Sequence, residues 1–148
     1  LQWIERLEPY ALGLDRFFFA TSGAEAVEGA LRLARQATGR AGVIAFRGGY
    51  HGRTAGTLAI TTSGIGYRGG NAGPLPYGAF FAPYPGLGGD EEYCRGQLDL
   101  LVKQQVAPSE VAAVILEPVL GEGGFVPAPH SFLKHLREWC DQSSLLSP

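Results

Sequence analysis

The chain has 148 residues, 45% of them apolar and 18% charged, which is enough to bury the core of one domain. With 12 basic and 14 acidic residues, its net charge of -2 argues against a nucleic-acid-binding surface and against a polybasic membrane patch. No stretch approaches the roughly 18 consecutive apolar residues of a membrane span, so we expect neither nucleic acid nor a membrane as a partner.

The start of the sequence and its cysteines bear on where the protein works. The sequence contains no methionine, and residues 1–6 resemble the middle of an amphipathic helix, so we expect a fragment or a processed product. A targeting peptide would not be visible in such a sequence. The 2 cysteines are far apart and fit a reducing compartment, so we expect a cytoplasmic protein, with mitochondria as the alternative.

The first apolar run leads into a helix that begins with small residues. Residues 17–20 predict a buried strand, and a helix is expected from about residue 24 to 37. Ser22 is a typical N-cap, and Glu25 would complete a capping box. The free N–H groups of a helix N-terminus suit a phosphate, and Gly23 would let a ligand approach the backbone. A capped helix start that binds nothing is an equally good interpretation of these residues.

An aromatic residue and a histidine follow the second predicted strand, at residues 43–46. Tyr50 and His51 lie in the glycine-rich segment 48–52, at the carboxyl end of that strand. A tyrosine in this place can lie against a planar ligand ring, because aromatic faces prefer offset stacking. Alternatively, Tyr50 half covers the edge of the sheet.

Two acidic residues follow the clearest buried strand, at residues 112–116. Glu117 comes directly after it and needs a partner if it is buried, because an unpaired buried charge is very costly. Glu122 follows in a glycine-rich loop. The two carboxylates either bind a polar ligand or an arginine, or they tether neighbouring loops, and their spacing does not distinguish these roles.

The remaining segments are a long irregular stretch and two helices. Residues 62–90 contain nine glycines and four prolines, with a short strand at 79–82, and a loop of this length is usually functional or covers something. Helices are expected at 91–106 and 129–142, with Cys94 half exposed and Cys140 in the core. We expect no metal site and no cysteine nucleophile, because the histidines and cysteines form no plausible cluster.

The alternation of apolar strands and helices indicates an α/β fold, with a mostly parallel sheet flanked by helices on both faces. In such sheets, ligands bind beyond the carboxyl ends of the strands. The loops at residues 21–25, 47–53 and 117–124 should meet there, so we expect the functional site in these three loops.

Together these loops resemble the class III aminotransferases, which have the fold type I architecture and use pyridoxal 5'-phosphate. The matching stretches are F-F-A-T-S-G-A-E-A-V-E-G-A-L-R-L-A-R (18–35), A-F-R-G-G-Y-H-G-R-T (45–54) and A-A-V-I-L-E-P-V-L-G-E-G-G-F (112–125). The resemblance implies that residues 1–142 are the N-terminal part of the cofactor-binding large domain, and that 143–148 are a divergent or truncated tail. Within the family, the sequence is most similar to 4-aminobutyrate and related omega-amino-acid aminotransferases.

The resemblance also implies roles for the residues of the first two loops. Gly23 and Ala24, next to Ser22, would hold the cofactor phosphate through backbone N–H groups. Many relatives have Ser or Thr at the position of Ala24, so one hydroxyl contact is lost here while the amides remain. Tyr50 would stack on the pyridine ring, and His51 would support it.

The two acids match positions of the family, whereas the two lysines do not. Glu117 would lie near the cofactor ring, and Glu122 would correspond to the acid that pairs with a substrate-site arginine, which has no counterpart in this sequence. The family's aspartate at the pyridine nitrogen and its Schiff-base lysine have no counterpart either, because Lys103 and Lys134 lie on predicted helices away from the site. We therefore expect no catalytic residue in this chain, and a chain that is inactive and poorly stable by itself.

The implied function is the transfer of an amino group from an amine or omega-amino acid to a 2-oxo acid by a homodimeric transaminase. An alternative is a truncated, non-catalytic product that binds the cofactor weakly or pairs with a full-length subunit. A third is an unrelated phosphate- or nucleotide-binding module, which predicts a lysine-bearing phosphate loop or an acidic ribose partner, and neither is evident.

Overall fold

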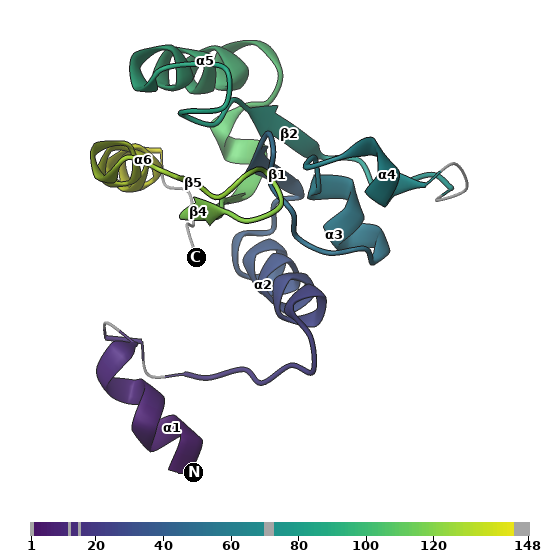
Figure 1. Cartoon of the computed structure of the whole chain (residues 1–148), viewed down its shortest axis with the longest axis vertical. Coiled ribbons are helices and arrows are strands. Elements are labelled where there is room, and N and C mark those ends of the chain that lie inside the picture. The colour runs from purple at the N-terminus through teal and green to yellow at the C-terminus, as the bar shows by residue number, and fades with distance from the viewer. Residues whose placement is uncertain (1, 12, 15, 70–72, 144–148) are drawn as a thin grey trace.

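A computed structural model describes residues 2–11, 13, 14, 16–69 and 73–143 of the chain (Figure 1). In chain order its elements are α1 (Gln2–Leu7), the 3-10 turn η1 (Glu8–Tyr10), α2 (Gly23–Thr38), β1 (Gly42–Phe46), α3 (Ala55–Ile60), α4 (Ile65–Arg68), β2 (Ala79–Ala82), α5 (Glu91–Gln104), η2 (Pro108–Glu110), β3 (Val111–Ile115), β4 (Val119–Leu120), β5 (Val126–Pro127) and α6 (His130–Gln142). The strands predicted at 43–46, 79–82 and 112–116, and the helices predicted after residues 23, 90 and 129, are confirmed to within a few residues.

A parallel sheet of three strands in the order β2-β1-β3 forms the centre of the fold. Val43 of β1 lies opposite Ala79 of β2 and Ala113 of β3. All residues of β1 and β3 are buried, as expected for strands whose two faces are both covered by helices.

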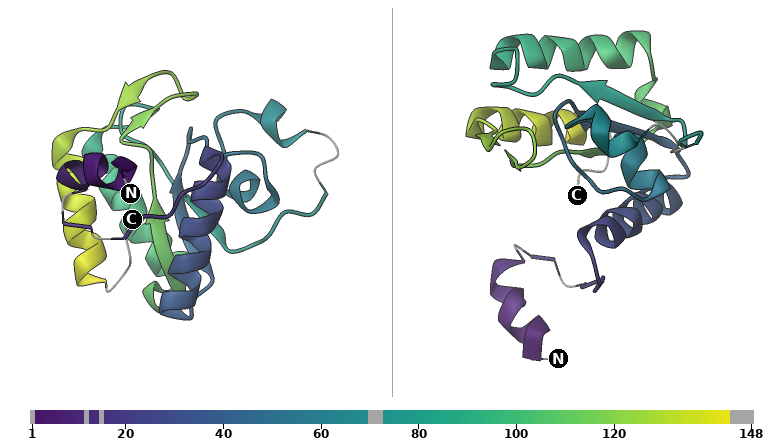
Figure 2. Two further views of the ribbon diagram at one scale, coloured as in Figure 1. Left: turned by 90° about the horizontal axis from the view of Figure 1, so that it is seen from below. Right: turned by 45° about the vertical axis from the view of Figure 1, so that its right-hand side comes forward.

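Helices cover both faces of this sheet, which confirms the predicted α/β architecture (Figures 1 and 2). On one face, Leu31 of α2 and Ile60 of α3 pack against β1 and β3. The larger core cluster lies on the other face, where Leu98 of α5 and Phe132 of α6 pack together with Phe46. The β-α-β connections therefore bring the carboxyl ends of β1 and β3 to one edge, with the start of α2 beside them.

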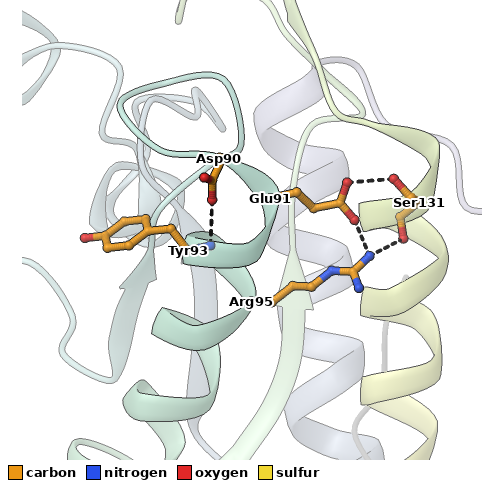
Figure 3. A network of polar contacts seen from close by, with 5 residues as sticks. All are labelled: Asp90, Glu91, Tyr93, Arg95 and Ser131. Carbon is orange, nitrogen blue, oxygen red and sulfur yellow. Dashed lines mark hydrogen bonds and ion pairs between the residues drawn. The ribbon is translucent and has the colours of Figure 1, made fainter.

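Polar contacts join the first turns of α5 and α6 (Figure 3). Asp90 caps α5 by accepting the backbone N–H of Tyr93 at 2.8 Å. Glu91 pairs with Arg95, and it also accepts the hydroxyl of Ser131 at 2.6 Å, while Arg95 donates to the carbonyl of Ser131 at 3.1 Å. These bonds fix the first turns of the two outer helices to each other.

Three features differ from the sequence-based predictions. Residues 17–20 form no strand, and the side chains of Phe18 and Phe19 are 77% and 61% exposed. A buried strand needs a hydrogen-bonded neighbour and cover on both faces, and the three-stranded sheet offers this segment neither. Cys94 is fully buried rather than half exposed, because it lies one helical turn before Leu98 on the inward face of α5. The short antiparallel pair β4–β5 was not predicted, since two-residue strands carry no alternation pattern.

The N-terminal helix lies apart from the sheet, at the end of an extended segment (Figures 1 and 2). None of the side chains of α1 is buried. Within the described residues, no helix is long and apolar enough to cross a membrane.

Candidate functional site

The three loops predicted to form the site meet at the carboxyl edge of the sheet. The carboxylate of Glu117 accepts the backbone N–H of Tyr50 at 2.6 Å and that of Gly121 at 2.9 Å, which joins loop 47–53 to loop 117–124. Loop 47–53 in turn lies against the start of α2, because a Cβ atom on Gly52 would come within 2.7 Å of the Cβ of Ala24. Only a glycine fits this contact, and its φ of +125° also favours glycine.

The start of α2 leaves its first amides unpaired. Ser22 is the N-cap, as predicted, and accepts the N–H of Glu25 at 3.2 Å. The Glu25 carboxylate accepts the backbone N–H and the hydroxyl of Thr21, at 2.8 and 2.6 Å. These bonds lower the pKa of Glu25. Among the described residues, the N–H groups of Gly23 and Ala24 have no hydrogen-bond acceptor.

Gly23 and Ala24 line an open pocket of about 610 Å³ between α2 and loop 47–53. The pocket is lined by Ser22, Gly23, Ala24, Val27, Tyr50, His51, Gly52, Arg53 and Thr54. A Cβ atom added at Gly23 would meet no other atom within 4 Å, so a ligand can approach the backbone there. Five of the seven predicted site residues thus lie around one cavity, and Glu117 and Glu122 are outside its lining.

Arg53 is the single charged side chain among the residues that line this pocket. We did not single it out from the sequence, although it directly follows the glycine-rich segment that carries Tyr50. A cation next to unpaired helix amides makes the pocket favourable for an anion.

Tyr50 is held in place by neighbours on two sides. Its backbone is bound by Glu117, and its ring meets the ring of Tyr67 edge-on, with centroids 4.9 Å apart and planes at 63°. Tyr67 lies on α4, within the stretch predicted to be irregular, where no periodic pattern distinguished it from its neighbours. Its hydroxyl donates to Glu122 at 2.5 Å, and this bond raises the pKa of Tyr67.

His51 is a buried polar residue beside Tyr50. Burial lowers the pKa of its imidazole, an effect that the negative charge of Glu117 partly opposes. Its backbone N–H donates to the hydroxyl of Thr61 at 3.0 Å, whereas its Nε2 atom has no hydrogen-bond partner within the described part of the chain. A buried polar atom without a partner is unusual in a folded protein and fits a site that is completed by another group.

Glu117 is anchored in the core through its backbone. The buried hydroxyl of Tyr84 lies 3.0 Å from the carbonyl oxygen of Glu117, 3.3 Å from that of Pro118 and 3.2 Å from that of Val126. Burial raises the pKa of Tyr84, so the phenol stays protonated and acts as the hydrogen-bond donor to these carbonyl oxygens. Of the two interpretations left open by the sequence, the structure shows the tethering of neighbouring loops for the Glu117 carboxylate.

Other candidate groups lie elsewhere. Lys103 and Lys134 are exposed on α5 and α6, and neither lines the pocket. Within the residues that the structure describes, no three His, Cys, Asp or Glu side chains are placed to hold a metal ion. Burial raises the pKa of the Cys140 thiol to about 11, so this cysteine is not a reactive thiolate.

Sequence comparison identifies the relatives of this chain. The sequence model of the family Aminotransferase class-III matches residues 1–146. The chain is 48% identical over 130 residues to the 5-aminovalerate aminotransferase DavT of Pseudomonas putida, a match that covers 85% of this chain and 30% of that protein. It is 41% identical over 128 residues to the 4-aminobutyrate aminotransferase GabT of Escherichia coli, again covering 85% of this chain and 30% of that protein.

Structure comparison agrees with the sequence. An amine transaminase from an uncultivated Pseudomonas species, solved in its PLP-bound form, matches with a TM-score of 0.88 and 29% identity, over 99% of this chain and 36% of that chain. The chain thus spans about 30% of the length of the curated relatives it matches. The match to the family extends over almost all 148 residues, and the fold matches as well, so this chain belongs to the class III aminotransferase family.

Proposed function

We propose that the pocket between α2 and loop 47–53 binds pyridoxal phosphate in a transaminase. One observation carries the proposal: Gly23 and Ala24, whose amides are unpaired among the described residues, line the same cavity as Tyr50. A phosphorylated planar ring needs an anion site and a flat aromatic surface within one cavity, and this pocket offers both.

The phosphate would bind at the first turn of α2. This helix has 16 residues, so its N-terminus carries the partial positive charge of a full helix dipole, and its first two amides are available as donors. Arg53 adds a full positive charge at the same cavity.

The ring would lie against Tyr50, with the buried imidazole of His51 beside it. When bound, pyridoxal phosphate supplies an electron sink and a carrier for the amino group. The protein's part is to hold the ring in one orientation, and the backbone contacts of Tyr50 and His51 serve that purpose.

The substrate pair would be an amino donor and a 2-oxo acid, and we favour an omega-amino acid as the donor. The relatives DavT and GabT are named for 5-aminovalerate and 4-aminobutyrate, which carry a carboxylate at the end opposite the amine. Tyr67, whose hydroxyl binds Glu122, contacts the ring of Tyr50, so this pair would lie beside the substrate.

A second candidate function is cofactor binding without catalysis. Transamination needs a lysine as covalent anchor and proton carrier, and no lysine lines the pocket within the described residues. We infer that these 148 residues alone bind pyridoxal phosphate without transferring amino groups. The complete activity and a homodimeric assembly are proposals that rest on the family, and a cytoplasmic location is a proposal that rests on the 2 cysteines.

The test replaces one phosphate-binding amide. Gly23→Pro removes the N–H of the first residue of α2, where proline is favoured, and the extended backbone of Ser22 before it is compatible with proline. Gly23→Ala keeps the N–H and serves as the matched control. Titration of pyridoxal phosphate, followed by the quenching of protein fluorescence, should show a Kd about 10- to 100-fold higher for Gly23→Pro, the size expected for one hydrogen bond to a charged group.

Two outcomes decide the proposal. A Gly23→Pro variant that binds as tightly as Gly23→Ala would show that the phosphate does not lie at this turn. An unchanged Tm in both variants would confirm that α2 is intact and that the loss is local.

A further inference from the structure

The backbone of loop 47–53 is fixed by hydrogen bonds before any ligand is present. The N–H of Gly48 donates to the hydroxyl of Thr62 at 2.9 Å. The carbonyl oxygen of Gly49 accepts the N–H of Thr62 at 2.8 Å and that of Ser63 at 3.1 Å. The first half of the loop is therefore bound to the segment that follows α3.

The second half of the loop has the same kind of support. The hydroxyl of Thr61 accepts the N–H of His51 at 3.0 Å and lies 3.0 Å from the carbonyl oxygen of Gly52. Thr61 is fully buried, so these bonds are shielded from competing water.

Tyr50 is the exception, because its backbone N–H is bound from the other side. Its acceptor is the carboxylate of Glu117, 67 positions further along the chain and at the end of a different strand. Tyr50 lines the pocket, so the bond to Glu117 fixes the backbone of the residue whose ring would contact a planar ligand.

The Glu117 side chain is fully engaged by the protein. One carboxylate oxygen binds the N–H of Tyr50 and the other binds the N–H of Gly121. A Cβ atom on Gly49 would lie 3.6 Å from the first of these oxygens and 3.0 Å from Nε2 of His51, so the carboxylate and the imidazole pack closely around a glycine. An ionised carboxylate can accept both bonds, whereas an amide side chain has only one acceptor oxygen.

We propose that Glu117 is a positioning residue, whose carboxylate clamps loop 47–53 to loop 117–124 and thereby sets the place of the Tyr50 ring against the cofactor. This proposal rests on the proposed function for its consequence, but the clamp itself is a property of the free protein.

The first test measures the hydrogen-exchange rates of backbone amides in the protein without ligand. Glu117→Ala should accelerate exchange of the Tyr50 and Gly121 amides about 10-fold or more, while the amide of Ile44 in the buried strand β1 keeps its rate. Glu117→Gln, which has nearly the same shape, should restore the protection of one of the two amides. Glu138→Gln, on the exposed side of α6, is the matched control and should change none of them.

The second test separates positioning from loss of stability. Leu98→Ala destabilises the core on the far face of the sheet, at a residue that does not line the pocket. We expect the Kd for pyridoxal phosphate to rise about 10-fold in Glu117→Ala, to recover partly in Glu117→Gln, and to stay unchanged in Leu98→Ala at a temperature where all variants are folded.

Protected Tyr50 and Gly121 amides in Glu117→Ala would overturn the clamp, as would faster exchange throughout β1 in both Glu117 variants. An unchanged Kd in a Glu117→Ala variant with exposed amides would overturn its role in positioning Tyr50. Absence of pyridoxal phosphate binding in the unmodified protein would instead refute the proposed function, and the exchange rates would still decide whether the clamp exists.

Discussion

Segment 16–20 and loop 47–53 both lie beside α2, yet the glycine-rich loop has a backbone fixed by hydrogen bonds and the apolar segment forms no strand. The first contains three consecutive phenylalanines and forms no strand, and Phe18 and Phe19 are exposed. The second contains three glycines and has a backbone fixed by Thr61, Thr62 and Glu117. Hydrophobicity alone thus forms no strand where a partner strand is missing, whereas hydrogen bonds from side chains to the backbone fix a segment in which three of seven residues are glycine.

The largest expected effect distinguishes buried from exposed phenylalanines. Phe132 is completely buried and meets Phe46 edge-on at 5.8 Å, so Phe132→Ala should lower the free energy of unfolding by about 3–5 kcal/mol. Phe19→Ala removes a side chain that is mostly in water and should change it by less than about 0.5 kcal/mol. Urea denaturation of both variants measures the difference. A comparable loss in Phe19→Ala would mean that segment 16–20 is covered in solution.

A smaller effect on the free energy of unfolding is expected where Tyr84 binds the carbonyl groups of Glu117 and Pro118 to the core. Tyr84→Phe removes the hydroxyl that three carbonyl oxygens surround, those of Glu117, Pro118 and Val126. Leaving them without this donor should cost about 1–3 kcal/mol in the free energy of unfolding. Tyr77→Phe is the control, because Tyr77 is 97% exposed and should be neutral. Equal stability of the two variants would show that water replaces the Tyr84 hydroxyl at no cost.

The elements of this fold could be predicted from the sequence where local patterns decide them. Ser22 caps α2 because a cap depends on neighbouring residues only, and the apolar runs at 43–46 and 112–116 are buried strands that also find a partner in the sheet. Residues 17–20 gave an equally apolar run, but a strand also depends on its neighbour in the sheet, which the run itself does not encode.

In the candidate site, too, the positions of loops could be predicted, whereas contacts between distant residues could not. The expectation that loops after parallel strands meet at one edge placed Tyr50, His51 and the start of α2 together, and the structure brings them to one pocket. The contacts of Tyr67 with Tyr50 and Glu122 could not be predicted, since α4 is a four-residue helix within a glycine-rich stretch. Likewise, no sequence pattern reveals that Glu117 binds a backbone N–H 67 positions away.

The smallest effect concerns the charge of the buried histidine. Burial lowers the pKa of His51 in the folded protein, whereas in the unfolded chain a histidine takes up its proton near pH 6.5. The unfolded state therefore binds more protons as the pH falls below about 6.5, and stability is lost there, by at most about 1.4 kcal/mol per pH unit for one proton. His51→Gln should weaken this dependence when unfolding by urea is compared at pH 7 and pH 5.5, and His130→Gln, at the exposed start of α6, should retain it. If His51→Gln loses as much stability as the unmodified protein, the proton is taken up elsewhere, and the imidazole beside Tyr50 is already accessible to water.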